Sequence, residues 1–487
     1  AKLSHIIIVV FAVISVLGFI AYFFEGIGKY ATEIMPWDLS AQFMGYELTS
    51  ARGYALIICV LTSLYTVKGG MHSVVATEVM QFVVMTIGCI GVGIVAYNSV
   101  SIEQLNAVIP NGWKDLRFGW ILDLNWSETP FPQVNEKIAS DGFTLFGGLF
   151  VLMVLKGILA SIAGPVPSYD MQRILAAKKP SEAAKMSFLT VAVLYIPRYF
   201  MVVGFTVLAL VYLGPEIAAM GPSIDFEKIL PMTMNAHLPV GLKGIMLAGF
   251  LAAFMGTFAA FINAAPAYIV NDIYKKYINP LASDKRLVRL SILSSLTLVF
   301  VGIVFGLNAG SLNSLILWLS SALYGGYVAA NVLKWVWWRF TGAGYFWGML
   351  FGLIASTVKL FFFPEYVDIF VFPLIFAFSL LGCVIGTYAT PLPNPEAVAA
   401  FYKQTRPWGF WGPVKASVMA KDPSFVPNTH FKRDGINVLV GMVWQMAQLL
   451  IPVYFMIREN AQMVIWSAVF LGCSYLLKKY WWNTLED

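Results

Sequence analysis

The chain has 487 residues, of which 59% are hydrophobic and only 12% are charged, and its mean hydropathy is +0.74. Soluble domains carry about 25% charged residues, so this composition excludes a water-soluble globular protein and indicates an integral membrane protein. The net charge of +6 does not predict a nucleic-acid partner, because the basic residues are distributed as membrane topology requires.

A helix needs about 20 predominantly apolar residues to cross the hydrocarbon core of a bilayer. Twelve segments meet this requirement, and none shows the apolar–polar alternation of barrel strands. We therefore predict an all-α integral membrane protein with about 12 transmembrane helices. The expected spans lie near 5–24, 51–67, 73–97, 144–164, 187–213, 241–269, 287–307, 311–336, 344–362, 366–391, 436–456 and 461–478.

The distribution of Lys and Arg predicts the orientation. If the N-terminus is cytoplasmic and the spans alternate, twenty-one of these residues fall on the cytoplasmic side and nine on the other side. Cytoplasmic loops of membrane proteins carry such an excess. We expect a multi-pass protein of the cell inner (plasma) membrane, with both termini of this chain in the cytoplasm.

The span at 144–164 breaks off at Gly164-Pro165-Val166-Pro167, and polar residues Ser168 and Tyr169 follow. Two closely spaced prolines remove helix hydrogen bonds and clash with the preceding turn, so the helix must unwind there. In secondary transporters such a discontinuity is the best sequence pointer to the substrate site. We expect Pro167, Ser168 and Tyr169 to line that site. The alternative is a helix that ends at the membrane interface in a proline-rich turn.

Lys156 lies inside the same span, more than two turns before the break. An intramembrane charge is costly and is a functional hypothesis by default. Lys156 is expected to bind an anionic group of the substrate or to replace a cation by its charge. The alternative is that it pairs with a carboxylate or extends to the interface.

The span at 311–336 carries Trp318, Ser321 and Tyr324, which can share one helix face. An aromatic ring and hydroxyl groups in this arrangement can stack on a sugar and bind it by hydrogen bonds. Trp318 and Ser321 are therefore candidate substrate contacts, with ordinary packing as the alternative.

Three segments together resemble the sodium:solute symporter family, which includes the sodium–glucose and sodium–proline cotransporters. The first, at 65–81, reads YTVKGG followed by SV, TE and Q. The second, at 172–183, reads QRILAAK followed by EA. The third, at 238–274, reads LPVGL, AAFM, N and DIY in order, and the stretch at 401–411 is similar to a tail found in the family.

The resemblance implies a leucine-transporter-like inverted-repeat helical bundle that forms a single membrane domain over 1–487. Residues 1–97 would supply the last three helices of the first repeat, 144–336 the second repeat and 337–487 additional C-terminal helices. The helices that open the first repeat in the family have no counterpart here. We therefore expect that this sequence is an N-terminally incomplete version of a longer protein, or else that it has lost these helices.

The resemblance also implies a sodium site on the span at 241–269, formed by Ala253, Gly256 and Thr257. A carbonyl of Ala253 and the hydroxyl of Thr257 can bind Na+, whereas Gly256 lacks the hydroxyl that most members of the family have at this position. The alternative is that Gly256 and the neighbouring alanines allow close helix packing.

The resulting prediction is sodium-coupled symport of a small organic solute, a sugar or sugar-derived acid, by alternating access. The expected ligands are Na+ and the solute, and the expected partners are the lipid bilayer and other membrane proteins, but no nucleic acid. Because neither Gly69-Gly70 nor Gly325-Gly326 fits a phosphate-binding loop, we expect neither a nucleotide-driven pump nor an enzyme. The alternatives are a non-transporting scaffold or sensor subunit, and a proton-coupled or uncoupled transporter in which Lys156 acts as the cation.

Overall fold

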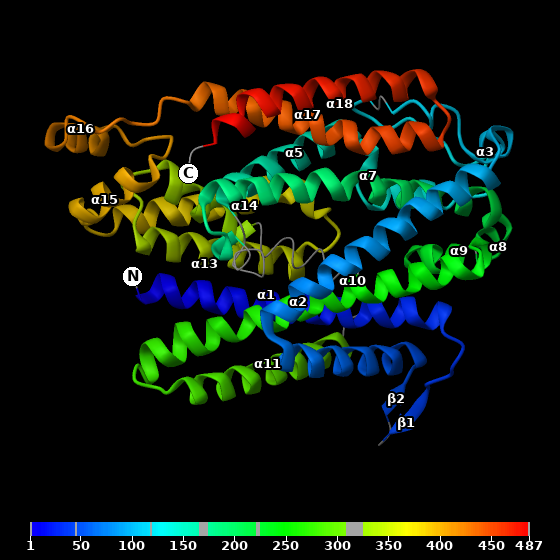
Figure 1. Cartoon of the computed structure of the whole chain (residues 1–487), viewed down its shortest axis with the longest axis horizontal. Coiled ribbons are helices and arrows are strands. Elements are labelled where there is room, and N and C mark those ends of the chain that lie inside the picture. The colour runs from blue at the N-terminus through cyan, green and yellow to red at the C-terminus, as the bar shows by residue number, and fades with distance from the viewer. Residues whose placement is uncertain are drawn as a thin grey trace. The chain divides into compact units, whose positions relative to one another are not determined.

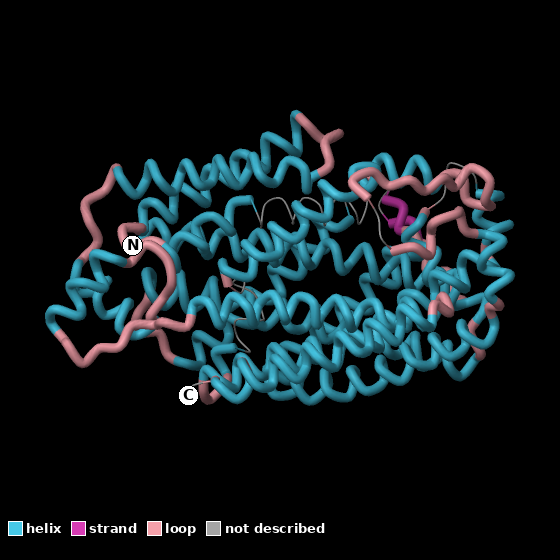
Figure 2. The backbone as a smooth tube through the Cα atoms, turned by 90° about the horizontal axis from the view of Figure 1, so that it is seen from above, coloured by secondary structure: helices cyan, strands magenta, loops and turns pink. Residues whose placement is uncertain are grey.

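The computed structural model of the chain describes residues 2–43, 46–116, 119–164, 174–220, 225–307 and 325–485. Helices make up nearly all of this part (Figure 1). Within the described residues the strands form one short hairpin, which stands out among the helices in Figure 2. Its strands β1 (Ala41–Phe43) and β2 (Tyr46–Leu48) are antiparallel, with Gln42 opposite Glu47.

Ten helices in the described residues are long and apolar enough to cross a membrane, and they coincide with ten of the twelve expected spans. The two other expected spans are not among these ten helices. The span at 51–67 is the first part of α2 (Ser50–Ser99), and the span at 311–336 is described from residue 325 onward, where it is helical. The prediction of an all-α membrane protein is confirmed.

Helix α2 contains 50 residues. A straight helix of that length would extend about 75 Å, well beyond a bilayer that measures about 45 Å with its headgroups. Figure 1 shows that the ribbon of α2 turns sharply part-way along, so its two ends run in different directions. The two spans expected at 51–67 and 73–97 are therefore joined by helical backbone instead of a loop.

The chain forms two compact units, and the first comprises Ala1–Tyr22, Leu145–Met171 and Ala264–Phe431. Its buried core includes Phe11, Tyr327, Met349 and Cys383. Its elements are the first part of α1 (Lys2–Ile34), α5 (Phe146–Ala163), η4 (Ala267–Ile278), α11 (Asp284–Leu307), α13 (Gly342–Phe362), α14 (Asp368–Tyr388), α15 (Pro395–Thr405) and α16 (Gly412–Lys421).

The second unit comprises Phe23–Thr144, Gln172–Asn263 and Lys432–Asp487. Val92, Leu208, Met234 and Met246 belong to its buried core. Its longer helices are α2, α7 (Pro180–Tyr212), α10 (Val240–Pro266), α17 (Phe431–Met456) and α18 (Asn460–Tyr480). Short elements between them are α3 (Ile102–Val108), α4 (Val134–Ser140), η1 (Phe143–Leu145), α8 (Gly214–Met220), η3 (Phe226–Lys228) and α9 (Ile229–His237), and η5 (Trp482–Thr484) follows α18.

Arg458, in the turn between α17 and α18, fixes this helix pair within the second unit. Its guanidinium donates to the carbonyl oxygens of Tyr97 and Val100 at 2.8 and 3.2 Å, and it lies 4.3 Å from the centroid of the Tyr97 ring. These carbonyls belong to the C-terminal end of α2, where intrahelical donors are missing. A cation at that end also complements the helix dipole.

Candidate functional site

The break predicted after residue 163 begins where it was expected. Helix α5 ends at Ala163, and Gly164 follows with a φ of 84°, a backbone conformation that favours glycine. Five candidate substrate contacts, Pro167, Ser168, Tyr169, Trp318 and Ser321, lie outside the described residues. Their role remains a prediction.

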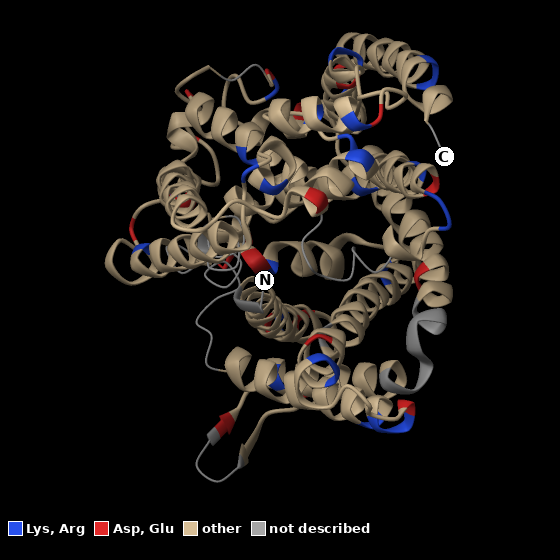
Figure 3. Cartoon of the chain, turned by 90° about the vertical axis from the view of Figure 1, so that its left-hand side faces the viewer, with Lys and Arg blue, Asp and Glu red and all other residues tan. Residues whose placement is uncertain are grey.

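Charged residues are sparse along the helices (Figure 3). In the first unit, three of them, Lys156, Lys359 and Asp368, form a charge cluster. The Lys359 ammonium lies 3.1 Å from the Asp368 carboxylate, and the two side chains are only 8% and 13% exposed. Lys156 on α5 is within electrostatic range of the same carboxylate. The arrangement therefore favours the carboxylate-paired alternative for Lys156, and its role toward a substrate stays a prediction.

The expected sodium ligands lie on α10 in the second unit. The Thr257 hydroxyl donates to the carbonyl oxygen of Ala253, one helical turn earlier, at 2.9 Å. The two oxygens on which the prediction relies are thus adjacent on one helix face. Gly256 is buried, whereas Ala253 is exposed and Thr257 is half-buried.

Gly256 faces α2 at close range. A Cβ built at this position would lie 2.6 Å from Oε1 of Gln81 and 3.5 Å from Cγ of Glu78. The Tyr65 hydroxyl, also on α2, donates to the carbonyl oxygen of Met255 at 3.2 Å. The motif at 65–81 and the motif on α10 therefore meet in space, although they are far apart in the sequence.

Glycines set the register of this contact. A Cβ at Gly88 or Gly91 of α2 would lie 2.6 Å from a side-chain atom of Met246 or Leu242, respectively, and one at Gly249 would lie 2.5 Å from the Met85 sulfur. These pairs advance along α2 while they retreat along α10, so the two helices pack antiparallel. This register places Glu78 opposite Gly256, and the end of the Gln81 side chain, one turn further along α2, reaches the same position.

Four side-chain or backbone groups at this site carry oxygens that can bind a cation. They are the Ala253 carbonyl, the Thr257 hydroxyl, the Gln81 amide and the Glu78 carboxylate. Carbonyl and carboxylate oxygens suit hard cations better than soft metals. Sequence reasoning placed Glu78 and Gln81 in a motif but not in the site. The signal that could have found Glu78 is an acidic residue close to a long apolar span.

A family model described as the sodium:solute symporter family matches residues 4–352. The chain belongs to the sodium:solute symporter family. The resemblance expected from the three motifs is thereby confirmed.

Relatives within this family carry transport names. Sodium/glucose cotransporter 4 of Danio rerio is 26% identical over 377 residues, which cover 71% of this chain and 53% of the relative. Sodium/myo-inositol cotransporter 2 of Oryctolagus cuniculus is 27% identical over 323 residues, which cover 62% of this chain and 46% of the relative. The chain thus spans about half the length of the curated relatives it matches.

The fold is also similar to a solved structure of a Na+-coupled sialic acid symporter in a substrate-bound, outward-open state. The TM-score is 0.57 at 16% sequence identity, and the match covers 79% of this chain and 75% of that one. At this identity the likeness shows the fold alone. The predicted helical symporter architecture agrees with it.

Proposed function

We propose that this chain carries out sodium-coupled symport of a small organic solute by alternating access. Membership of the symporter family supports the reaction class. The observation that carries the sodium assignment is the pair of oxygens on α10, the Ala253 carbonyl and the Thr257 hydroxyl, 2.9 Å apart. Oxygens at this separation can bind a single cation together.

The Na+ gradient would supply the driving force. Moving one charge across the membrane contributes about 2.3 kcal/mol per 100 mV of potential. Gly256 contributes no hydroxyl, and the side chains of Gln81 and Glu78, which lie beside it on α2, carry oxygens that would take its place.

The proposed solute is a sugar or a sugar-derived acid. The relatives named for glucose and myo-inositol support a polyhydroxylated solute. A polyhydroxylated solute needs side chains that form hydrogen bonds with its hydroxyl groups and an aromatic ring that stacks on it. Trp318, Ser321 and Tyr169 are expected to supply these groups.

The test is a Thr257→Val variant in proteoliposomes, because valine keeps the shape of threonine and removes the oxygen. Apparent Na+ affinity for solute uptake should fall at least about tenfold, or about 1.4 kcal/mol. The matched control is Thr190→Val on α7, whose hydroxyl makes the same bond to the carbonyl one turn earlier, at 2.9 Å. If both variants keep the normal Na+ dependence at normal protein levels, the sodium site is elsewhere.

The position of Glu78 beside Gly256, which has no hydroxyl, is one observation in favour of proton coupling. The Glu78 carboxylate can bind a proton, and the proton would then take the place of the sodium ion. In that case, uptake should persist when Na+ is replaced by choline, and it should follow an imposed pH gradient. Glu78→Gln should then abolish the response to the gradient. Absence of uptake under either gradient would instead favour the non-transporting scaffold.

A further inference from the structure

An apolar groove of about 680 Å³ lies in the first unit, between α13 and α14. Its volume is within the range of about 300–1,000 Å³ that is typical of small-molecule sites, which are lined mainly by hydrophobic and aromatic side chains. The walls include Ile354, Ala355 and Val358 from α13, and Leu374 and Phe378 from α14. The groove is separate from the candidate sodium site, which lies in the second unit.

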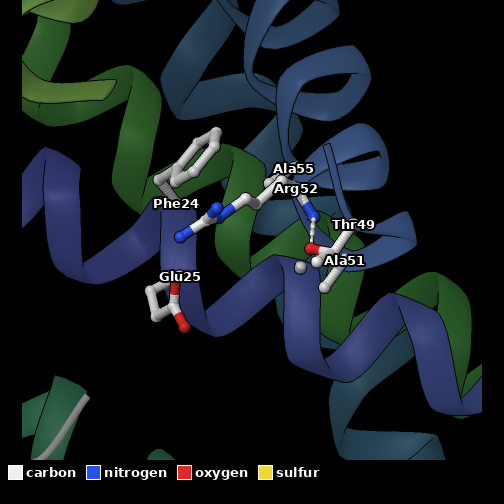
Figure 4. A pocket seen from close by; sticks show the side chains of 7 residues that line it. Phe24, Glu25, Thr49, Ala51, Arg52 and Ala55 are labelled. Carbon is white, nitrogen blue, oxygen red and sulfur yellow. Dashed lines mark hydrogen bonds between the residues drawn. The ribbon is translucent and has the colours of Figure 1, made fainter. Parts of the chain in front are cut away.

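The groove differs in chemistry from a polar pocket of the second unit, where α1 meets the first turns of α2. In that pocket the side chains of Glu25 and Arg52 point toward one another (Figure 4), and Lys29 is also within electrostatic range of Glu25. The charges of the polar pocket are therefore compensated within the protein. Apart from Lys359 and Tyr366, the residues that line the groove are apolar, so its occupant must be apolar along most of its length.

Both walls of the groove belong to helices that are long and apolar enough to cross a membrane. Four wall residues, Ile354, Val358, Leu374 and Phe378, are 41–59% exposed. Exposed apolar surface of this kind marks a contact with a membrane or with another protein. The dimensions of the groove distinguish between these two occupants.

The groove is about as long as one leaflet of the bilayer is thick. It runs from Phe351 to Phe363 along α13, and from Tyr366 to Phe378 along α14. Each wall thus advances twelve residues, or about 18 Å at about 1.5 Å per residue, whereas half of the hydrocarbon core measures about 15 Å. The turn at the outer end carries the exposed residues Glu365 and Tyr366, and tyrosine is enriched at the membrane–water interface. The groove therefore extends from the membrane surface to about the midplane.

Glycines close the groove at its inner end. A Cβ at Gly382 would lie 2.6 Å from the carbonyl oxygen of Trp347, and one at Gly386 would lie 2.7 Å from that of Ala343. The two helices are therefore in close contact at this end, and they separate only toward the turn. A transmembrane helix of a partner needs about 20 residues to cross the bilayer and would contact the pair along its whole length. An acyl chain of one leaflet ends near the midplane, as the groove does.

A buried ion pair lies near the outer end of the groove. Lys359 is one of the lining residues, and its ammonium lies 3.1 Å from the Asp368 carboxylate. Water in an unfilled groove would weaken the attraction between these charges, because the attraction falls as the local dielectric constant rises. An apolar occupant keeps water away from the pair.

We propose that this groove is a specific site for one acyl chain of a phospholipid, in the leaflet on the side of the α13–α14 turn. Lipid hydrocarbon is as apolar as the groove, so burial alone gives the chain no preference for this site over the surrounding bilayer. The preference comes from van der Waals packing of the chain against the aromatic and branched walls. The bound chain completes the surface of the helix pair and shields Lys359 and Asp368 from water.

Native mass spectrometry of the purified chain, in detergent with added palmitoyl-oleoyl phosphatidylglycerol, tests this proposal. One lipid should remain bound to each chain after detergent washing. Ala355→Trp places an indole in the groove and should lower the lipid-bound fraction at least tenfold. The matched control is Leu381→Trp, because Leu381 is 50% exposed on α14 but lies outside the groove. This control should retain lipid as the unmodified chain does.

The thermal midpoint separates loss of the site from loss of the fold. A lipid that binds the folded state raises the midpoint as its concentration increases. The midpoints of the unmodified chain and of Leu381→Trp should therefore rise with added phosphatidylglycerol. The midpoint of Ala355→Trp should be normal without lipid and should not rise, because the indole already fills the groove.

The proposal is overturned if no lipid remains bound to the unmodified chain, or if Ala355→Trp and Leu381→Trp lose lipid equally. If Ala355→Trp does not fold, Val358→Trp, at a wall position that is 41% exposed, provides the same comparison. Both measurements are made without Na+ or solute, so their outcome does not depend on the proposed sodium site.

Discussion

At the scale of single residues, glycines decide how closely the helices of this protein approach one another. Three of them face different surroundings. A Cβ at Gly352 would lie 2.2 Å from the backbone Cα of Gly326, one at Gly256 would meet the flexible end of Gln81, and one at Gly441 would meet nothing within 4 Å. A side-chain end can move away, but a backbone atom of a packed helix cannot.

Alanine substitutions at these glycines should therefore rank in a fixed order of stability. Gly352→Ala should cost about 3 kcal/mol through overpacking, and Gly256→Ala should cost about 1 kcal/mol because Gln81 can move aside. Gly441→Ala should be neutral or stabilising by up to about 1 kcal/mol, because alanine is the better helix former. Thermal midpoints of the purified variants measure the order, and equal midpoints for Gly352→Ala and Gly441→Ala would contradict it.

The charge cluster of Lys156, Lys359 and Asp368 predicts an asymmetry between its members. Asp368→Asn breaks the buried ion pair with Lys359 and removes the carboxylate within range of Lys156. It should destabilise the protein by about 3–5 kcal/mol, the usual result of breaking a buried ion pair. Lys359→Met leaves Asp368 within range of Lys156 and should cost roughly half as much. Equal losses of stability in Asp368→Asn and Lys359→Met would show that Lys156 does not replace Lys359 as the partner of Asp368. The Lys156→Met and Lys359→Met variants, measured side by side, compare the two lysines directly.

At the scale of elements, the segment that follows α14 forms a small helical cap of its own. The indole N–H of Trp411 donates to the Trp335 carbonyl oxygen at 2.8 Å, and Tyr402, Trp411, Val414 and Val418 form a buried cluster. The sequence predicts no transmembrane span between residues 391 and 436. The structure shows that this segment contains two helices, α15 and α16, which are held against the end of the span at 325–336.

The cap should loosen in acid. The hydrogen bond from Lys403, supported by one from Ser424, lowers the pKa of Asp422 below its ordinary value of 3.8. A group whose pKa is lowered by folding contributes stability above its unfolded pKa and loses it as the pH falls through its folded pKa. Hydrogen-exchange protection of α16 should therefore decrease below about pH 3.8. In Asp422→Asn, this dependence should disappear.

At the scale of the whole molecule, the distribution of Lys and Arg predicts which loops face the cytoplasm. The loop at 98–143 should lie outside and the cap at 392–430 inside. A membrane-impermeant maleimide should label Asn111→Cys on intact cells but label Ala420→Cys only after permeabilisation. Cys59, Cys89 and Cys383 are buried, so a Cys473→Ser background suffices. The reverse labelling pattern would invert the proposed orientation.

Much of the fold could be predicted because it depends on local physics. In lipid, every backbone polar group must be satisfied within its own segment, so apolar length alone predicts helices. The end of α5 before Gly164 follows from the prolines after it, and the motifs at 65–81 and 238–274 identify the family. Thr257 and Ala253 are close together because they are one turn apart on the same helix.

The contacts between helices could not be predicted in this way. The sequence does not show that Lys156 and Lys359 both lie within electrostatic range of Asp368, or that Gln81 and Glu78 lie beside Gly256. Each of these contacts joins helices whose relative register is set by close packing, at positions such as Gly88 and Gly249. That register depends on all the side chains in the contact at once, so only the tertiary structure decides it.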